Sequence, residues 1–278
     1  MTRSRVVRWT AGAGYYGVLA LVTVAALGPT LWVMLSSFKT SGQVLSDPSL
    51  LPRPFTLQGY ADAFSQVHLE RFVLNTALYA IGGSLGALVT AFLAAYPTAR
   101  YDFRGRNVVV GAFSLALAIP VVGLATPEFF IVRELGLFDT RIGLVIFYSA
   151  LFFPLSFVIL RAFLVDLPVE IEEAAIVDGA GYFLLLRKIV LPLARPALAT
   201  AAVIAFVGIW NEFFFANLLT GSVDHQNVQL ALASFRSQFG FNVSGALAGA
   251  TLVMLVPVLA FLLLQRHVVE GLTAGAVK

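Results

Sequence analysis

Cysteine and charged residues are what this chain of 278 residues most clearly lacks. Because there is no cysteine, disulfide bonds and thiolate metal sites are excluded. Aspartate, glutamate, lysine and arginine together make up 12% of the sequence, whereas a soluble domain carries about 25%. Hydrophobic residues make up 59%. This composition predicts that lipid, rather than water, surrounds most of the folded chain.

Motifs for metal binding, nucleotide binding and hydrolysis are also missing. The three histidines, at positions 68, 225 and 267, show no metal-ligand spacing. There is no Gly-x-x-x-x-Gly-Lys-Ser/Thr phosphate loop, no nucleophile elbow and no His-Glu-x-x-His motif. We therefore expect no metal site and no cofactor bound by this chain. The net charge of +3 is small, and membrane topology accounts for it, so we expect no nucleic acid partner.

Six apolar stretches are long enough to cross about 30 Å of hydrocarbon as helices. The first follows three arginines like a secretory signal, but its apolar run is too long for one, so we expect an uncleaved span. Pro120 and Pro127 leave open a broken or tilted helix near the end of the third. The sequence predicts an all-α integral membrane protein with six transmembrane helices, at about residues 14–35, 72–96, 108–126, 143–163, 197–218 and 245–264.

Lysine and arginine are distributed unevenly between the segments that connect these spans. With the N-terminus inside, twelve of the eighteen lie on the cytoplasmic side. Short cytoplasmic loops carry such an excess, so we expect both termini in the cytoplasm. The loop over residues 164–195 is then cytoplasmic as well.

That loop has the pattern of two short helices joined at glycine. Pro168 suits a first helical turn, and the acidic residues after it suit the positive end of the helix dipole. Gly179 is free to take a positive φ where the first helix ends. A second helix is expected over residues 182–190. Residue by residue, an ordinary amphipathic loop at the membrane surface explains this segment, but the whole pattern indicates docking to a soluble partner.

The fixed spacing of Glu173-Ala174-Ala175, Gly179 and Ile189-x-Leu191-Pro192 resembles the signature loop of the binding-protein-dependent ABC importer permeases. Gly181 and Tyr182 depart from it, because that family often has a serine or threonine helix cap there. Further motifs resemble the carbohydrate-importer permeases of the maltose-transporter MalG type over nearly the whole chain. They include Ala99-Arg100-Tyr101-Asp102-Phe103-Arg104-Gly105-Arg106, Leu135-Gly136-Leu137-Phe138-Asp139-Thr140, Trp210-Asn211-Glu212-Phe213 and the ending Gly271-Leu272-Thr273-Ala274-Gly275-Ala276-Val277-Lys278.

The resemblance implies a single permease domain over residues 1–278 with a MetI-like core. Its core spans would cover about residues 72–264, its coupling loop residues 164–195 and its cytoplasmic tail residues 265–278. The chain would be a non-catalytic subunit of an ATP-driven importer of a sugar or sugar-like solute in a prokaryotic plasma membrane. Implied partners are a second related permease, two ATPase subunits that bind ATP and magnesium, an extracytoplasmic solute-binding protein and the lipid bilayer.

The resemblance also assigns roles to two sets of residues. The first set would couple the chain to the ATPase: Glu173, Ala174, Ala175, Asp178, Gly179, Ala180, Gly181, Ile189, Leu191 and Pro192. The second set, in the small and nearly uncharged tail, would reach between the ATPase subunits: Thr273, Ala274, Gly275 and Ala276.

Asn211 and Glu212 are polar residues within the fifth apolar stretch. A charged side chain at the bilayer centre costs about 2.5–3.5 kcal/mol, so it should face protein or water. Two roles fit equally well: a position on the pathway or its gate, and a structural cap near the outer helix end. The segment after them, residues 221–241, should lie outside, contain a short helix and meet the binding protein.

Two other functions remain as alternatives. A self-sufficient secondary transporter would carry paired intramembrane ionisable groups and usually an internal repeat, neither of which is evident. A membrane enzyme would gather histidine, aspartate or glutamate at one membrane face, and no such cluster is evident either. The sequence leaves the solute open among maltose-like disaccharides, trehalose, amino sugars and glycerol phosphate.

Overall fold

The computed structural model describes residues 3–235 and 242–274, which fold as helices joined by turns with no strand among them. Four helices are long and apolar enough to cross a membrane. Two bent helix pairs raise that number to as many as six. The expected all-α membrane fold is therefore confirmed, with four to six candidate spans.

The described chain divides into two compact units. The first contains α1 (Arg3–Ser36), α2 (Ser41–Ser46), α3 (Gln58–Ser65) and the beginning of α14 (Val243–Ala274). None of the most apolar 18-residue window of α1 is buried within this chain, so that helix needs lipid or another protein around it.

Close packing of α3 on α14 holds the first unit together. Gly59 lies so near α14 that a Cβ atom there would be 2.6 Å from the backbone oxygen of Ser244. The Ser244 hydroxyl donates to the backbone oxygen of Lys39 at 2.7 Å. Lys39 itself is 1% exposed, and its ammonium donates to the carbonyl oxygens of Asp47 and Ser49. A buried cation is thus satisfied by backbone oxygens.

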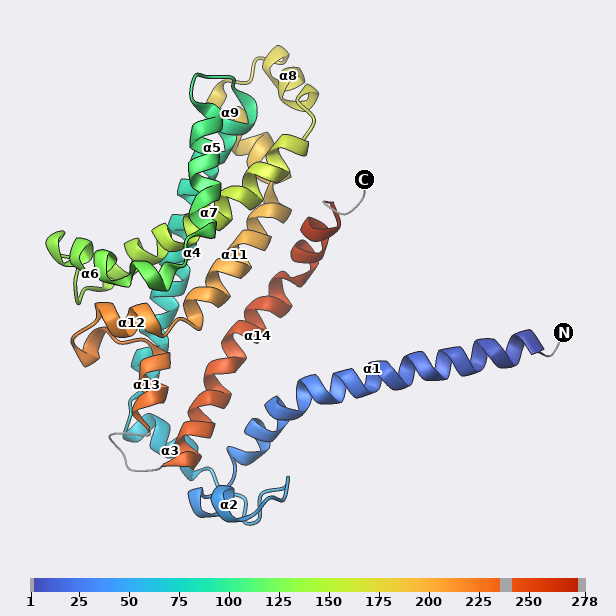
Figure 1. Ribbon diagram of the computed structural model, residues 1–278, viewed down its shortest axis with the longest axis vertical. Coiled ribbons are helices and arrows are strands. Elements are labelled where there is room, and N and C mark those ends of the chain that lie inside the picture. Colours follow the sequence, from blue (N-terminus) through green and yellow to red (C-terminus); the bar gives the residue numbers. More distant parts are fainter. Residues whose placement is uncertain (1–2, 236–241, 275–278) are drawn as a thin grey trace. The chain divides into compact units, whose positions relative to one another are not determined.

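In the second unit, α4, α7 and α11 run side by side, with α8 and α9 at one end and α12 toward the other (Figure 1). Gly83 permits the contact of α4 with α7, because a Cβ atom there would lie 2.8 Å from the Cβ of Tyr148. The α-helices of this unit are α4 (Leu69–Arg100), α5 (Arg106–Leu115), α6 (Ala125–Glu134), α7 (Arg141–Asp166), α8 (Glu170–Val177), α9 (Tyr182–Leu185), α10 (Leu191–Leu193), α11 (Arg195–Trp210), α12 (Phe214–Leu219), most of α13 (Val228–Ser234) and the part of α14 from Leu255 onward.

The third apolar stretch is broken, as the two prolines left open. The helices over Arg106–Ala118 and Val121–Glu134 meet at an angle of 97°. Between them, Ile119 takes an extended backbone conformation (φ −84°, ψ 124°) before Pro120. A residue that precedes proline disfavours the helical conformation, which accounts for the position of the break.

The fifth apolar stretch was expected to be one helix over residues 197–218, and that expectation is wrong. α11 ends at Trp210, and α12 begins only at Phe214. At its other end α11 is bent by 70° from the helical segment Tyr182–Leu193. Hydropathy could not predict this break, because phenylalanines follow position 212 and an apolar side chain fits a short packed helix as well as a transmembrane helix.

The last helix is longer than expected. α14 continues ten residues beyond position 264 and ends at Ala274, so the first part of the expected tail is helical. The residues from 265 to 270 include no glycine or proline. A single glycine at position 271 costs about 1 kcal/mol in a helix, which a continuing helix tolerates.

Candidate functional site

The turn that ends α8 is the most sharply specified part of the loop between α7 and α11. Gly179 has a φ of +86°, which confirms the expected left-handed position. Its backbone N–H donates to the Ile176 carbonyl at 3.0 Å, and the Ala180 N–H donates to the Ala175 carbonyl at 2.9 Å. These two bonds form a Schellman motif, which satisfies carbonyls at the helix end.

The second helical segment of the loop begins without a side-chain cap. Gly181 occupies the cap position and offers no hydroxyl, as the departure from the family pattern implied. After α9, residues Leu186–Val190 form a π-helical turn before α10. Pro192 cannot donate to the carbonyl of Lys188, so the ordinary helical ladder is interrupted there. Single π turns of this kind often occur at functional sites.

The predicted coupling residues divide into an exposed set and an anchoring set. Glu173, Ala174, Asp178, Gly179 and Gly181 are exposed. Ala175 is buried, and Ala180, Ile189, Leu191 and Pro192 are half-buried. The core on which Ala175, Ala180, Ile189 and Leu191 pack also contains Phe157, Leu160 and Leu164 of α7 and Ala91 and Ala95 of α4. The loop therefore packs directly onto two spans while keeping Glu173, Ala174 and Gly179 at the surface.

Large apolar side chains on the loop remain uncovered. Val177 is 86% exposed and Phe183 is 73% exposed, and Ile176, Tyr182 and Leu184 are exposed as well. So many large apolar side chains exposed within residues 176–184 indicate a contact with a partner or with lipid.

The structure adds a buried ion pair that the sequence reasoning missed. Glu172 is 4% exposed, and its Oε1 accepts from Nε of Arg100 at 2.6 Å. Its Oε2 accepts from the hydroxyl of Tyr96 at 2.8 Å. Arg100 also donates from Nη2 to the carbonyl of Leu167 at 3.1 Å. A signal was available, because Glu172 lies three residues before Ala175 and thus on the same helix face.

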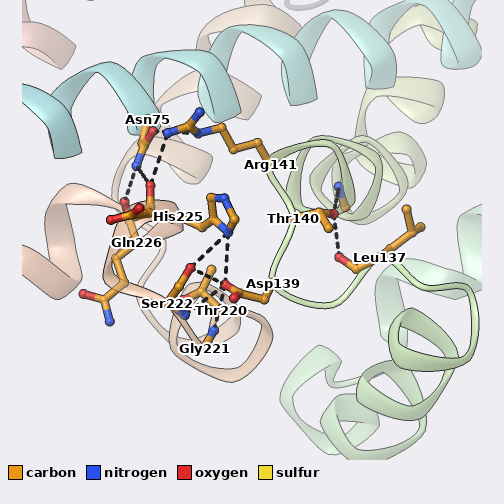
Figure 2. Close-up of polar contacts among 12 residues, drawn as sticks. Asn75, Leu137, Asp139, Thr140, Arg141, Thr220, Gly221, Ser222, His225 and Gln226 are labelled. Atoms are coloured by element: carbon orange, nitrogen blue, oxygen red, sulfur yellow. Dashed lines mark hydrogen bonds and ion pairs between the residues drawn. The ribbon is translucent and has the colours of Figure 1, made fainter.

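The other end of α4 holds the segment that follows α12 (Figure 2). The Asn75 amide donates to the carbonyls of Asp224 and Gln226 at 2.8 and 3.0 Å. Its Oδ1 accepts from Nε of Arg141 at 3.1 Å. One turn further along α4, the hydroxyl of Tyr79 donates to the carbonyl of His225 at 2.7 Å. Backbone groups of this segment are thus fixed by side chains of one span.

Asp139 closes the same segment from the turn before α7 (Figure 2). Its Oδ1 accepts from the backbone N–H groups of Gly221 and Ser222, both at 3.0 Å, and from the Ser222 hydroxyl at 2.9 Å. The Nδ1 atom of His225 lies 3.1 Å from the same oxygen. Burial alone would raise the pKa of Asp139, but the hydrogen bonds from Ser222 and Gly221 outweigh it and lower the pKa to about 2.

The two polar residues of the fifth stretch lie at the break after α11. The Glu212 carboxylate accepts from the backbone N–H groups of Phe215 and Ala216 at 2.7 and 2.9 Å, so it caps α12. Asn211 is exposed, and its amide donates to the Val207 carbonyl at 2.9 Å. The cap expected as one alternative accounts for the contacts of Glu212, while Asn211 presents its side chain outward.

The remaining predicted positions are placed only in part. Thr273 and Ala274 form the end of α14, whereas Gly275 and Ala276 lie outside the described residues. Within the described ranges, no group of three or more histidine, aspartate or glutamate side chains is placed to hold a metal ion.

Known proteins resemble this chain along nearly its whole length. Residues 83–273 match the family model of the binding-protein-dependent transport system inner membrane component. The chain is 36% identical to the trehalose transport system permease protein SugB of Mycobacterium tuberculosis, with 96% of this chain and 98% of that protein covered. It is 32% identical to the diacetylchitobiose uptake system permease protein NgcG of Streptomyces coelicolor, with 94% and 87% covered.

A solved structure confirms the fold. A chain of a bacterial ABC transporter involved in the import of the polysaccharide alginate superposes with a TM-score of 0.79 at 23% identity. The superposition covers 96% of this chain and 98% of that one. The family match, rather than this fold match, supports an importer permease over a self-sufficient secondary transporter and is consistent with a subunit that is not an enzyme. The chain belongs to the binding-protein-dependent transport system inner membrane components, as a multi-pass permease subunit of an ABC importer.

Proposed function

We propose that this chain forms half of the pathway of an ATP-driven importer for a sugar or sugar-like solute. A second related permease would form the other half, two ATPase subunits would hold ATP and magnesium, and an extracytoplasmic binding protein would deliver the solute. Support for a sugar comes from relatives named for the transport of trehalose and diacetylchitobiose. The whole chain, residues 1–278, would act as one permease domain that binds no cofactor itself.

The uncovered apolar surface of the loop, led by Val177 and Phe183, carries the docking part of the proposal. A short helix that packs on two spans and exposes large apolar side chains is suited to a groove on a soluble partner. The exposed motif residues would lie at that contact, and the half-buried ones would hold the helices in place. We assign the ATPase contact to α8 and α9, with Glu173, Ala174 and Gly179 at its centre.

The same assignment places α8 in the cytoplasm and the segment fixed by Asn75 and Asp139 on the outer face. The binding protein would meet that outer segment. The core spans over residues 72–264 would move around the pathway, and the tail over residues 265–278 would extend toward the ATPase pair through Thr273, Ala274, Gly275 and Ala276. Asn211, with its exposed amide, is the better candidate to face the pathway, and Glu212 would shape the wall behind it.

Purification of the tagged chain from its own membrane tests this proposal. We expect a second permease and an ATPase to co-purify, and the reconstituted complex to take up a disaccharide only with ATP inside and binding protein outside. The isolated chain in liposomes should transport nothing. Uptake by the isolated chain, or a Val177→Asp variant that retains the ATPase as well as the unmodified chain does, would contradict the proposal.

A further inference from the structure

α4 connects two polar contacts that lie at its opposite ends. Near its C-terminal end, Tyr96 and Arg100 hold Glu172 of the coupling helix α8. Near its N-terminal end, Asn75 holds the backbone of residues 224–226, and the Thr76 hydroxyl accepts from the Val228 N–H at 2.8 Å. Each contact joins α4 to a part of the chain far away in sequence.

One continuous helix separates the two contacts. Asn75 and Arg100 are 25 residues apart within α4, which corresponds to about 37 Å at 1.5 Å per residue. A displacement applied at one end of a packed helix is carried to the other end, because hydrogen bonds along its backbone and close-packed core contacts resist deformation.

The contact at α8 is built to resist separation. The side chains of Glu172 and Arg100 are each only 6% exposed, so either charge would be stranded in a dry site if the other moved away. Tyr96 donates to the second carboxylate oxygen, which leaves both oxygens of Glu172 bound. Because Arg100 also binds the Leu167 carbonyl, the start of the loop is held by the same guanidinium.

We propose that the Glu172–Arg100 ion pair, supported by Tyr96, is the positioning element through which α8 moves α4 and thereby the segment at residues 224–228. These are positioning residues, since none of them needs to touch the solute or the ATP. This inference rests on the proposed function in one respect, namely that α8 docks on an ATPase.

The assembled transporter in lipid nanodiscs provides the test, with four measurements on each variant. They are the amount of ATPase retained, the rate of ATP hydrolysis, the solute taken up per ATP in matched liposomes, and the labelling of a Val223→Cys reporter. Val223 is exposed in the segment that α4 holds, and the chain has no other cysteine. In the chain that carries Val223→Cys and no other change, we expect the labelling rate to change when vanadate traps the transporter.

Glu172→Gln removes the charge and keeps the shape. We expect this variant to retain the ATPase and to hydrolyse ATP, while uptake per ATP falls about tenfold and the reporter stops responding to vanadate. Asn75→Ala, at the far end of α4, should abolish the same reporter response. Glu134→Gln changes an exposed carboxylate of α6 outside both contacts and is the matched control.

Reversal of the pair separates positioning from packing. Arg100→Glu alone should lose the coupling, and the double variant Glu172→Arg with Arg100→Glu should recover at least half of the uptake per ATP. Normal uptake per ATP in Glu172→Gln overturns the proposal, as does an unrecovered double variant. Loss of the ATPase from Glu172→Gln also overturns it, because the pair would then only shape the docking surface. A different result would contradict the docking assignment: Val177→Asp would then retain the ATPase in full.

Discussion

The hydroxyl of Tyr148 donates a 2.7 Å hydrogen bond to the Glu212 carboxylate, so α7 is tied to the break between α11 and α12. The same carboxylate receives two backbone N–H groups of α12. The Glu212 side chain therefore connects α7 to α12 at the point where the chain leaves α11.

Removal of the Glu212 carboxylate should destabilise the chain more than removal of the Asn211 amide. Glu212→Ala leaves the N–H groups of the buried Phe215 and Ala216 without an acceptor, which costs about 1–3 kcal/mol. Asn211→Ala, at an exposed position, should cost under about 0.5 kcal/mol. The measurement is the thermal unfolding midpoint in detergent, and equal shifts for the two variants would contradict the cap.

Substitution at Gly179 tests the backbone conformation of the turn, because a side chain there would have free space. A Cβ atom there would meet nothing within 4 Å, so any effect must come from the φ of +86°. Valine is disfavoured by about 1–2 kcal/mol or more in the left-handed region, whereas asparagine adopts that conformation readily. We expect Gly179→Val to insert in the membrane yet retain little ATPase, and Gly179→Asn to retain most of it. Equal retention by both would show that the turn is not required.

Asp139 makes the stability of the segment over residues 221–226 dependent on pH. Its pKa of about 2 lies below the ordinary 3.8, so the ionised carboxylate stabilises the folded segment above about pH 4. That stabilisation, on the order of 1 kcal/mol after the screening by solvent at this accessible carboxylate, is lost as the pH falls from about 4 to about 2. Protease cleavage within residues 221–226 should rise over this range, when measured with an acid-active protease. Asp139→Asn should already be cleaved faster at pH 5 and should lose the acid dependence, whereas Asp102→Asn should behave as the unmodified chain.

Single cysteines test the proposed sidedness directly, because the chain supplies no background thiol. Val223→Cys and Val177→Cys both place the thiol at exposed positions. We expect a membrane-impermeant maleimide to label position 223 in intact cells and position 177 only after permeabilisation. The opposite pattern would reverse the topology. Asn227, in contrast, is 1% exposed and is unsuited to crosslinking of a binding protein.

Deletion of the chain end tests the tail. Loss of residues 273–278 should reduce solute-stimulated ATP hydrolysis several-fold without lowering membrane insertion, since the small residues there would fit between ATPase subunits. Deletion of residues 275–278 alone keeps Thr273 and Ala274, so the difference in ATP hydrolysis between the two deletions measures the contribution of the end of α14. Unchanged hydrolysis and uptake in both deletions would remove the tail from the mechanism.

The spans could be predicted where apolar length alone decides the structure, as for α4 and α7. The break near Pro120 could also be anticipated, because proline acts locally. The end of α11 could not, because Phe213–Phe215 are apolar in either arrangement and the cap on Glu212 depends on residues that fold around it. In the same way, Glu170, Glu172 and Glu173 all suit the first turn of α8. The spacing to Ala175 favours Glu172 as the residue on the packed face, but its partner Arg100 lies 72 residues away and could not be identified from the sequence.

The break after α11 has a consequence for how the protein can move within lipid. α11 has 16 residues, or about 24 Å of helix, which is shorter than a bilayer's hydrocarbon thickness of about 30 Å, so we expect the break after it to lie within the membrane. Peptide groups at that depth must be satisfied by protein or water. The Asn227 amide donates to the Glu212 carbonyl, and the Gln229 amide donates to the Trp210 carbonyl at 3.3 Å. Any opening that draws residues 227–229 away from the break must therefore admit water in their place, and hydration of that point becomes part of the cost of each transport cycle.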